Sequence, residues 1–173
     1  MRKAKRSLRI EPNEPEEGIV VAEEEIKEEI IDSMLDQVQL KESSHYALLR
    51  NLLLKMPYEA VVTLEKRNLK FVIIEKGDRA ITEHIKNNVR RKESWILLIV
   101  DEEMKRHSRP DQESIIAEEL AHCFLKHKDV DNECVRNTGD YRKDYLHELD
   151  AAAQMKKWEI RYVNSKELES GEG

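Results

Sequence analysis

The sequence has few of the features that mark a secreted, membrane-bound or thiol-based protein. It has two cysteines, Cys123 and Cys134, and no CxxC pair, so neither a disulfide framework nor a thiolate zinc site is indicated. The longest apolar run, Trp95 to Val100, is far shorter than the roughly 20 residues that a membrane-spanning helix needs. The N-terminus has no apolar segment of the signal-peptide kind. We therefore expect a soluble, cytoplasmic protein without a membrane partner.

Acidic residues outnumber basic residues, and the basic residues are not clustered. The net charge is −6, charged residues make up 38% of the chain, and only the first nine positions are rich in Lys and Arg. Direct nucleic-acid binding through a basic surface is therefore not expected. The 39% of apolar residues in 173 positions suit one domain with a hydrophobic core, and we find no internal repeat.

The two ends of the chain are predicted to lie outside this domain. Residues 1–18 are first basic and then acidic around two prolines, a composition that cannot bury enough apolar area to order itself. Residues 164–173 form a second polar tail. The prediction is a disordered tail over 1–18, a single domain over 19–163 and a C-terminal tail.

Hydrophobic periodicity predicts an α+β domain with N-terminal helices, a small β-sheet and two further helices packed against it. The expected helices are Val21 to Leu40, Ser44 to Lys55, Tyr58 to Lys66, Ser108 to Lys128 and Lys143 to Tyr162. The expected strands are Leu69 to Glu75 and Trp95 to Asp101, with a turn at Gly77 and Asp78, a strand or helix over 79–91, and a loop over 129–142. The continuous apolar character of Trp95 to Asp101 indicates a strand covered on both faces.

The helix from Ser108 to Lys128 carries polar groups within an apolar surface. Glu118 and His122 lie one turn apart on one face, and Glu119 lies beside them. Ser108 and Asp111 form a capping pattern with Pro110 in the first turn. Like charges embedded among apolar residues are costly unless something compensates them. A bound cation is one such compensation.

The last predicted helix offers a third carboxylate. Glu148 shares a stripe with Tyr145, Ala151, Ala152 and Met155. Asp150 lies on nearly the opposite side. The alanines allow another helix to approach closely, so Glu148 is the carboxylate expected to point inward.

Together, the EExxH segment, its spacing to Glu148 and the following ELDAAAQM segment resemble the zincin-like metallopeptidases of the ImmA/IrrE type. The order of helices and short apolar strands before the site helix is also similar to that family. The resemblance covers about Ser44 to Trp158. It implies that Glu119 is the general base of catalysis and that His122 and Glu148 are metal ligands. Glu118 stands where the family has the first histidine of its HExxH motif.

The resemblance further implies a zinc-dependent endopeptidase, but the Glu118 substitution changes the ligand chemistry. Two carboxylates and one imidazole neutralise a divalent ion, which then lowers the pKa of its water less. Catalysis should be weaker, and Mn²⁺ should compete better with Zn²⁺. The cofactor expectation is therefore Zn²⁺, with Mn²⁺ or no metal as alternatives.

Several of these side chains also have plain structural interpretations. Without a metal, Glu118 and Glu119 form a partly exposed pair and His122 is a core histidine bonded to one of them. His127 lies about 140° around the helix from His122 and is expected to favour the helix C-terminus instead. His147 is an alternative ligand, although it points about 100° away from Glu148. Among the remaining candidates, Tyr141 and Tyr145 are expected to pack or to donate to an oxyanion, Cys123 to be a core residue, His84 a surface histidine and His107 a residue near the helix cap.

Two functions follow from these patterns. In the first, the protein is a metal-dependent endopeptidase, and the resemblance implies a cytoplasmic protein substrate such as a helix-turn-helix repressor of a phage or other mobile element or of a stress response. In the alternative, it is a catalytically impaired metallopeptidase scaffold that regulates a protein partner by binding it. The acidic helix Ala22 to Asp36 would then be the contact surface.

Overall fold

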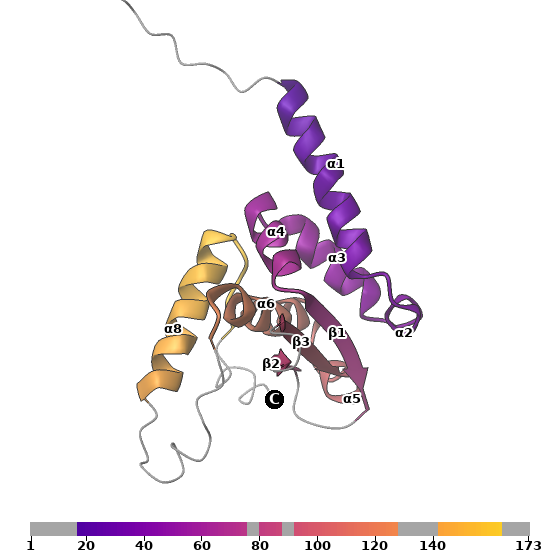
Figure 1. Cartoon of the computed structure of the whole chain (residues 1–173). Coiled ribbons are helices and arrows are strands. Elements are labelled where there is room, and N and C mark those ends of the chain that lie inside the picture. Colours follow the sequence, from indigo (N-terminus) through magenta and orange to yellow (C-terminus); the bar gives the residue numbers. More distant parts are fainter. Residues whose placement is uncertain (1–16, 76–79, 88–91, 128–141, 164–173) are drawn as a thin grey trace, which may run out of the picture.

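The structure is a computed structural model that describes residues 17–75, 80–87, 92–127 and 142–163. This part of the chain has an α+β fold with seven helices and three strands (Figure 1). The helices are α1 Glu17–Met34, α2 Val38–Lys41, α3 Tyr46–Lys55, α4 Tyr58–Lys66, α5 Asp101–Met104, α6 Arg109–Leu125 and α8 Arg142–Lys157. The strands are β1 Leu69–Ile74, β2 Ala80–Asn87 and β3 Lys92–Val100. The predicted C-terminal tail, the turn at Gly77 and Asp78, and nearly all of the predicted N-terminal tail and 129–142 loop lie outside the described residues.

The sheet has the strand order β1-β3-β2, with β1 parallel and β2 antiparallel to the central strand. The segment 79–91, for which the sequence allows either a strand or a helix, forms the strand β2 over its described residues 80–87. The prediction that both faces of β3 are covered holds only in part: Leu97 and Ile99 are buried, whereas Leu98 between them is partly buried. On β2, Ile81 is 40% exposed. A sheet with an antiparallel strand tolerates one open face, and the inner face carries the core.

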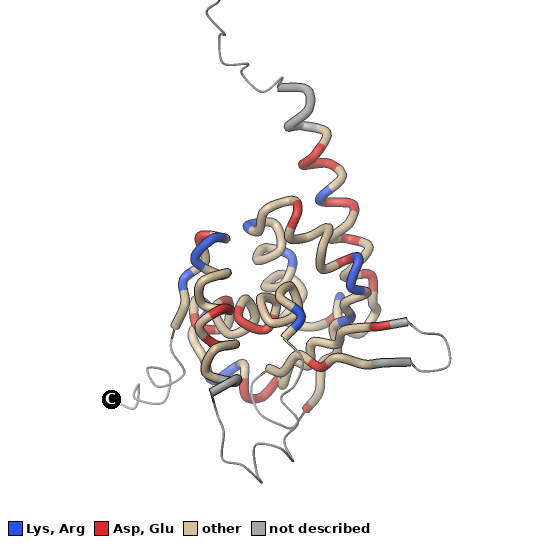
Figure 2. Tube along the Cα trace, turned by 60° about the vertical axis from the view of Figure 1, so that its left-hand side comes forward, with Lys and Arg blue, Asp and Glu red and all other residues tan. Residues whose placement is uncertain are grey.

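The first predicted helix is interrupted. Helix α1 ends at Met34, Gln37 has an extended backbone (φ −130°), and the short α2 follows. Ile31 in α1 and Leu35 just after it face the core, whereas Val38 is 73% exposed because the break turns it away from their stripe. Helix α1 packs on α3 and α4, and its N-terminal end projects from the body (Figures 1 and 2).

The next two helices have the predicted arrangement. Helix α3 ends where Met56 takes an extended backbone before Pro57, as the steric limits on a pre-proline residue require. The first residue before α3, His45, is 2% exposed, and its Nε2 lies 2.8 Å from Asp101 Oδ1 at the end of β3. This contact joins the start of α3 to the first residue of α5, which follows β3 and precedes α6.

We predict that the two faces of β3 differ in their contribution to stability. Leu97→Ala removes a fully buried side chain and should lower the free energy of unfolding by about 2–5 kcal/mol, the usual cost of a core cavity. Leu98→Ala is the matched control, since it removes the same atoms from the partly exposed face and should cost clearly less. Urea denaturation measures both values. Equal losses would contradict the one-sided burial of the sheet.

Candidate metal centre

Helix α6 begins as the sequence predicts. Ser108 is the N-cap residue, and its hydroxyl accepts a hydrogen bond from the backbone N–H of Asp111. The same hydroxyl donates to the Asp111 carboxylate at 2.6 Å, and Pro110 occupies the first turn. The helix then runs through a buried stripe that includes Ile116, Leu120 and Cys123. The strongly capped start and the apolar stripe fix the direction in which Glu118 and His122 project.

The end of α6 is reached earlier than predicted. Lys126 has a left-handed backbone (φ 60°), its N–H donates to the Cys123 carbonyl, and the N–H of His127 donates to the His122 carbonyl at 3.0 Å. This pair of bonds is a Schellman motif, in which the residue after the left-handed position folds back over the last helical turn. His127 is therefore folded back over His122 instead of continuing the helix.

Helix α8 packs beside α6 (Figure 1), and their ends are joined by an edge-to-face pair of Phe124 and Trp158 with ring centroids 5.4 Å apart. It ends at Lys157, before the predicted Tyr162, in a second Schellman motif. Here Glu159 is left-handed (φ 59°), and the N–H of Ile160 donates to the Met155 carbonyl. The reversed chain is held on α6 by a buried hydrogen bond from the N–H of Val163 to Ser114 Oγ, 2.9 Å long.

The two helices bring Glu118, His122 and Glu148 together. Each offers one ligand atom, and these atoms all lie within 4.8 Å of one another. His122 Nε2 is 3.6 Å from Glu148 Oε1, and the Glu148 side chain is 49% exposed while that of His122 is 15% exposed. The predicted convergence is confirmed. Glu148 nevertheless faces His122 from a half-exposed position and is not enclosed in the core.

The donor set fits a divalent cation. Tetrahedral ligand bonds of about 2.0 Å place the ligand atoms about 3.3 Å apart, close to the His122–Glu148 separation of 3.6 Å. Two carboxylates within 4.8 Å repel each other by between about 1 and about 3 kcal/mol, depending on solvent screening. A cation between them would replace this repulsion by attraction. The chemistry suits Zn²⁺ and also harder ions such as Mn²⁺.

Glu119 joins α6 to the edge strand β2. The backbone N–H of Thr82 donates to Glu119 Oε2 at 2.6 Å, and the Thr82 hydroxyl donates to the Glu119 carbonyl at 3.0 Å. These bonds hold the Glu119 carboxylate against the backbone of β2. They also give Glu119 a structural role that the sequence does not reveal, because a hydrogen bond between a helix residue and a strand residue far away in the sequence leaves no recognisable pattern.

Three histidines lie against one another at the triad. The Nδ1 atoms of His122 and His127 are 2.9 Å apart, which is hydrogen-bond distance. The His127 ring stacks on that of His147, with centroids 4.1 Å apart and planes 6° apart. The separation of about 140° around the helix, on which the sequence interpretation of His127 rests, does not apply here, because a helical wheel does not hold beyond a left-handed residue. His147, the alternative ligand, is not among the residues of the described part of the chain whose ligand atoms converge.

Tyr162 is a site residue that the sequence interpretation missed. Burial, followed by the negative charges of Glu118 and Glu148, raises the pKa of its phenol, so the hydroxyl stays protonated near the triad. By contrast, Tyr145 is 64% exposed, and Tyr141 lies outside the described residues. Because α8 ends at Lys157 and the chain then reverses, Tyr162 returns towards α6.

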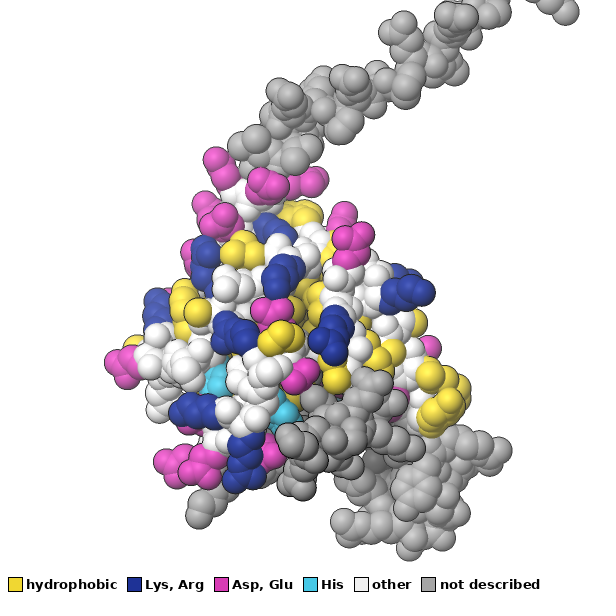
Figure 3. Space-filling model, turned by 180° about the vertical axis from the view of Figure 1, so that it is seen from behind, with side chains coloured by type: hydrophobic (Ala, Val, Ile, Leu, Met, Phe, Trp, Pro, Cys, Tyr) yellow, Lys and Arg dark blue, Asp and Glu magenta, His cyan; other side chains and the backbone are white. Residues whose placement is uncertain are grey.

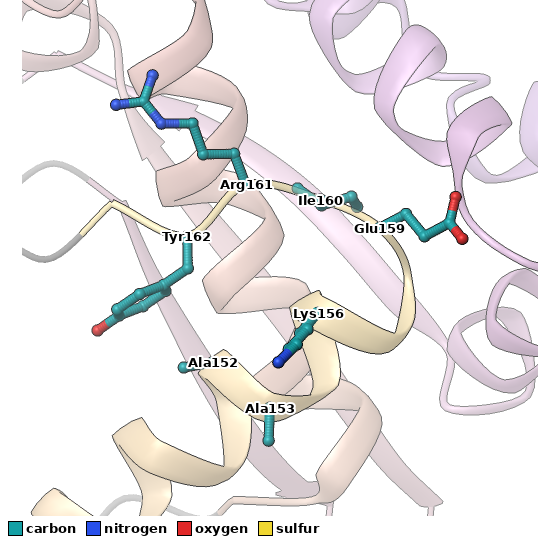
Figure 4. A pocket seen from close by; sticks show the side chains of 7 residues that line it. All are labelled: Ala152, Ala153, Lys156, Glu159, Ile160, Arg161 and Tyr162. Atoms are coloured by element: carbon teal, nitrogen blue, oxygen red, sulfur yellow. The ribbon is translucent and has the colours of Figure 1, made fainter.

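A pocket of about 610 Å³ opens between the last turns of α8 and the reversed chain (Figure 4). Its lining residues are Ala152, Ala153, Lys156, Glu159, Ile160, Arg161 and Tyr162. Ala152 lies one turn along α8 from Glu148, and Figure 4 shows the Tyr162 ring beside it. The three candidate ligands do not line this pocket, but Ala152 places its edge one helical turn from Glu148.

Other expected roles had mixed outcomes. Cys123 is confirmed as a buried core residue, and burial raises the pKa of its thiol to about 12. The surface assignment of His84 is wrong: its side chain is 6% exposed, and its ring lies 4.8 Å from that of Trp95. The cross-strand pairing of these two residues covers the ring. His107 precedes the cap of α6, and its Nε2 is buried.

Comparisons with known protein families, with characterised proteins and with solved structures give no match for this chain. The similarity to ImmA/IrrE-type peptidases therefore stays a prediction from the sequence. Within the described residues, no helix combines the length and the apolar content that crossing a bilayer requires.

We predict that glycine at the left-handed end of α6 stabilises the protein. Lys126 has φ 60°, a conformation that is costly for a residue with a Cβ atom, so Lys126→Gly should raise the free energy of unfolding by about 1 kcal/mol. Lys156→Gly is the matched control, because it places glycine inside a helical turn and should lower stability by a similar amount. Thermal and urea unfolding measure both. A destabilised Lys126→Gly variant would contradict the observed chain reversal.

We also predict a pH dependence that belongs to His127. Burial, and then the neighbouring His147 and His122, lower its pKa from 6.5 to about 4 in the folded protein. The unfolded chain therefore binds more protons in this window, and stability that is complete above about pH 6.5 declines as the pH falls towards 4. In the metal-free protein, His127→Asn should flatten this decline in urea titrations at several pH values. An unchanged slope would show that His127 does not titrate in this way.

Proposed function

We propose that this protein is a metal-dependent endopeptidase whose ion is held by Glu118, His122 and Glu148. The observation that carries the proposal is the convergence of these ligand atoms from two helices to within 4.8 Å. One imidazole and two carboxylates are a donor set for a catalytic rather than a structural ion, because three protein ligands leave a position for water or substrate. When bound, such an ion would activate water and polarise a scissile carbonyl.

The protein side chains have separate tasks in this proposal. Glu119, held by Thr82, takes the proton from the attacking water and delivers it to the leaving amine. The protonated phenol of Tyr162, close enough to Glu118 and Glu148 to respond to their charge, donates a hydrogen bond to the developing oxyanion. The pocket beside Ala152 and Tyr162 receives part of the substrate.

The substrate class comes from the sequence resemblance. ImmA/IrrE-type peptidases imply a cytoplasmic protein substrate, and a helix-turn-helix repressor is the proposed target. The three carboxylates of Glu118, Glu119 and Glu148 make the site acidic, so a bound ion would be more neutralised than in an HExxH enzyme and the reaction slower.

A second function is favoured by one specific observation. The Thr82 bonds to Glu119 account for that residue without catalysis, and Glu118 replaces a histidine ligand of the resembling family. In this alternative, the fold is a peptidase scaffold that binds a regulatory partner. Its contact surface would be the projecting α1, where acidic side chains gather (Figures 2 and 3).

Metal analysis distinguishes these functions. We expect the wild-type protein to bind one Zn²⁺ or Mn²⁺ per chain in titration calorimetry and elemental analysis. His122→Gln and Glu148→Gln each remove a ligand and should weaken binding by more than the roughly 100-fold that loss of an outer partner costs. Glu113→Gln is the matched control, since Glu113 is on the same helix but pairs with Lys55 at 2.7 Å, and its loss should leave metal binding unchanged.

The Glu118→His variant completes the experiment. It restores a two-histidine helix face and should bind Zn²⁺ more tightly than the wild type. A wild-type protein without metal, together with a Glu118→His variant that gains zinc, would reject the peptidase proposal for this chain and leave the scaffold alternative.

A further inference from the structure

The chain reversal at Lys126 creates a contact that the triad alone does not explain. His122 Nδ1 lies 2.9 Å from His127 Nδ1, and the two rings meet at an angle of 62°. A hydrogen bond between two imidazole nitrogens needs a proton on one and a lone pair on the other. The contact therefore couples the tautomers of the two rings.

The position of Glu148 decides which tautomer suits a metal ligand. The His122 nitrogen that faces Glu148 is Nε2, at 3.6 Å. A neutral imidazole that binds a cation through Nε2 must carry its proton on Nδ1. His122 Nδ1–H then donates to His127 Nδ1, and His127 carries its own proton on Nε2.

We propose that His127 is the positioning residue of this centre: it accepts the Nδ1–H bond of His122 and thereby holds the Nε2 lone pair of His122 towards Glu118 and Glu148. This inference rests on the proposed metal-binding function. In most metal sites a carboxylate or a backbone carbonyl does this task, and it sets both the tautomer and the ring orientation of the ligand. Here a second imidazole does it.

His127 is itself held in the required orientation. Its backbone N–H is bonded to the His122 carbonyl at 3.0 Å, and its ring is stacked on His147 with the planes 6° apart. Its Nε2 lies 3.9 Å from Asp150 Oδ2, beyond hydrogen-bond length, but the carboxylate charge still favours a proton on this nitrogen. The side chain of His127 is only 11% exposed, so water does not readily replace it as the partner of His122.

A pair of variants separates the acceptor role from simple packing. His127→Leu removes the acceptor, and Zn²⁺ affinity should fall by roughly 10–100-fold, the usual loss when an outer partner of a metal ligand is removed. His127→Asn keeps a carbonyl oxygen at a similar reach and should restore most of the affinity. Glu113→Gln is the control, because Glu113 pairs with Lys55 and its loss should leave Zn²⁺ affinity unchanged.

Nitrogen-15 NMR of the histidine rings gives a readout that a merely structural role would not change. In Zn²⁺-loaded wild type we expect His122 to be protonated at Nδ1 and metal-bound at Nε2, and His127 to be protonated at Nε2. These spectra need only the wild-type protein, so they decide the assignment even if His127→Leu fails to fold.

The outcomes distinguish this inference from the proposed function. A wild-type protein that binds no Zn²⁺ overturns both. Zinc binding that needs Glu118, His122 and Glu148 but is unchanged in His127→Leu overturns the positioning role alone. Coordination of zinc through His122 Nδ1 also overturns it, because that nitrogen could not then donate to His127.

Discussion

The candidate site depends on the packing of α8 against α6. Glu118 and His122 lie on one helix and supply only two of the three protein ligands that a catalytic metal site usually has. Ala151 and Met155 are fully buried, so α8 lies close to its neighbour and the turn before Ala151 delivers Glu148 to His122. The Phe124–Trp158 pair closes the far end of this interface. A change that separates the two helices therefore disrupts the triad even if all three candidate ligands are unchanged.

Two chain reversals complete the surroundings of the triad. At Lys126 and Glu159 the chain takes a left-handed conformation, and in each case the next residue folds back over the preceding helix. The first reversal places His127 on His122, and the second brings Tyr162 into the electrostatic field of Glu118 and Glu148. The two helix ends thus supply side chains that a straight continuation of either helix would carry away from the site.

The predictable parts of the fold are those governed by strong local signals. Pro57 forces the end of α3, and the Ser108 cap starts α6, so these boundaries agree with the sequence. The triad was also predictable, since helical spacing places Glu118 beside His122. The reversals were not, because lysine and glutamate carry no preference for a left-handed backbone and only the surrounding packing imposes it. The incomplete cover of one face of β3 escaped prediction for a related reason: apolar side chains show what can be buried, not what covers them.

The carboxylate of Glu118 would affect how the surrounding residues act in the proposed centre. With histidine at this position, a divalent ion beside Glu148 would keep one positive charge and would have two neutral donors. With Glu118 and Glu148 as carboxylates, a bound divalent ion would be nearly neutralised, and His122 would be the only neutral donor among the three candidate ligands. Its lone pair must then be aimed correctly for the site to favour zinc over ions that prefer oxygen. In the proposed centre, a fixed tautomer of His122 would therefore carry more of the metal selectivity than it would beside a second histidine ligand, and His127, placed by the Schellman end of α6, would be the residue that fixes it.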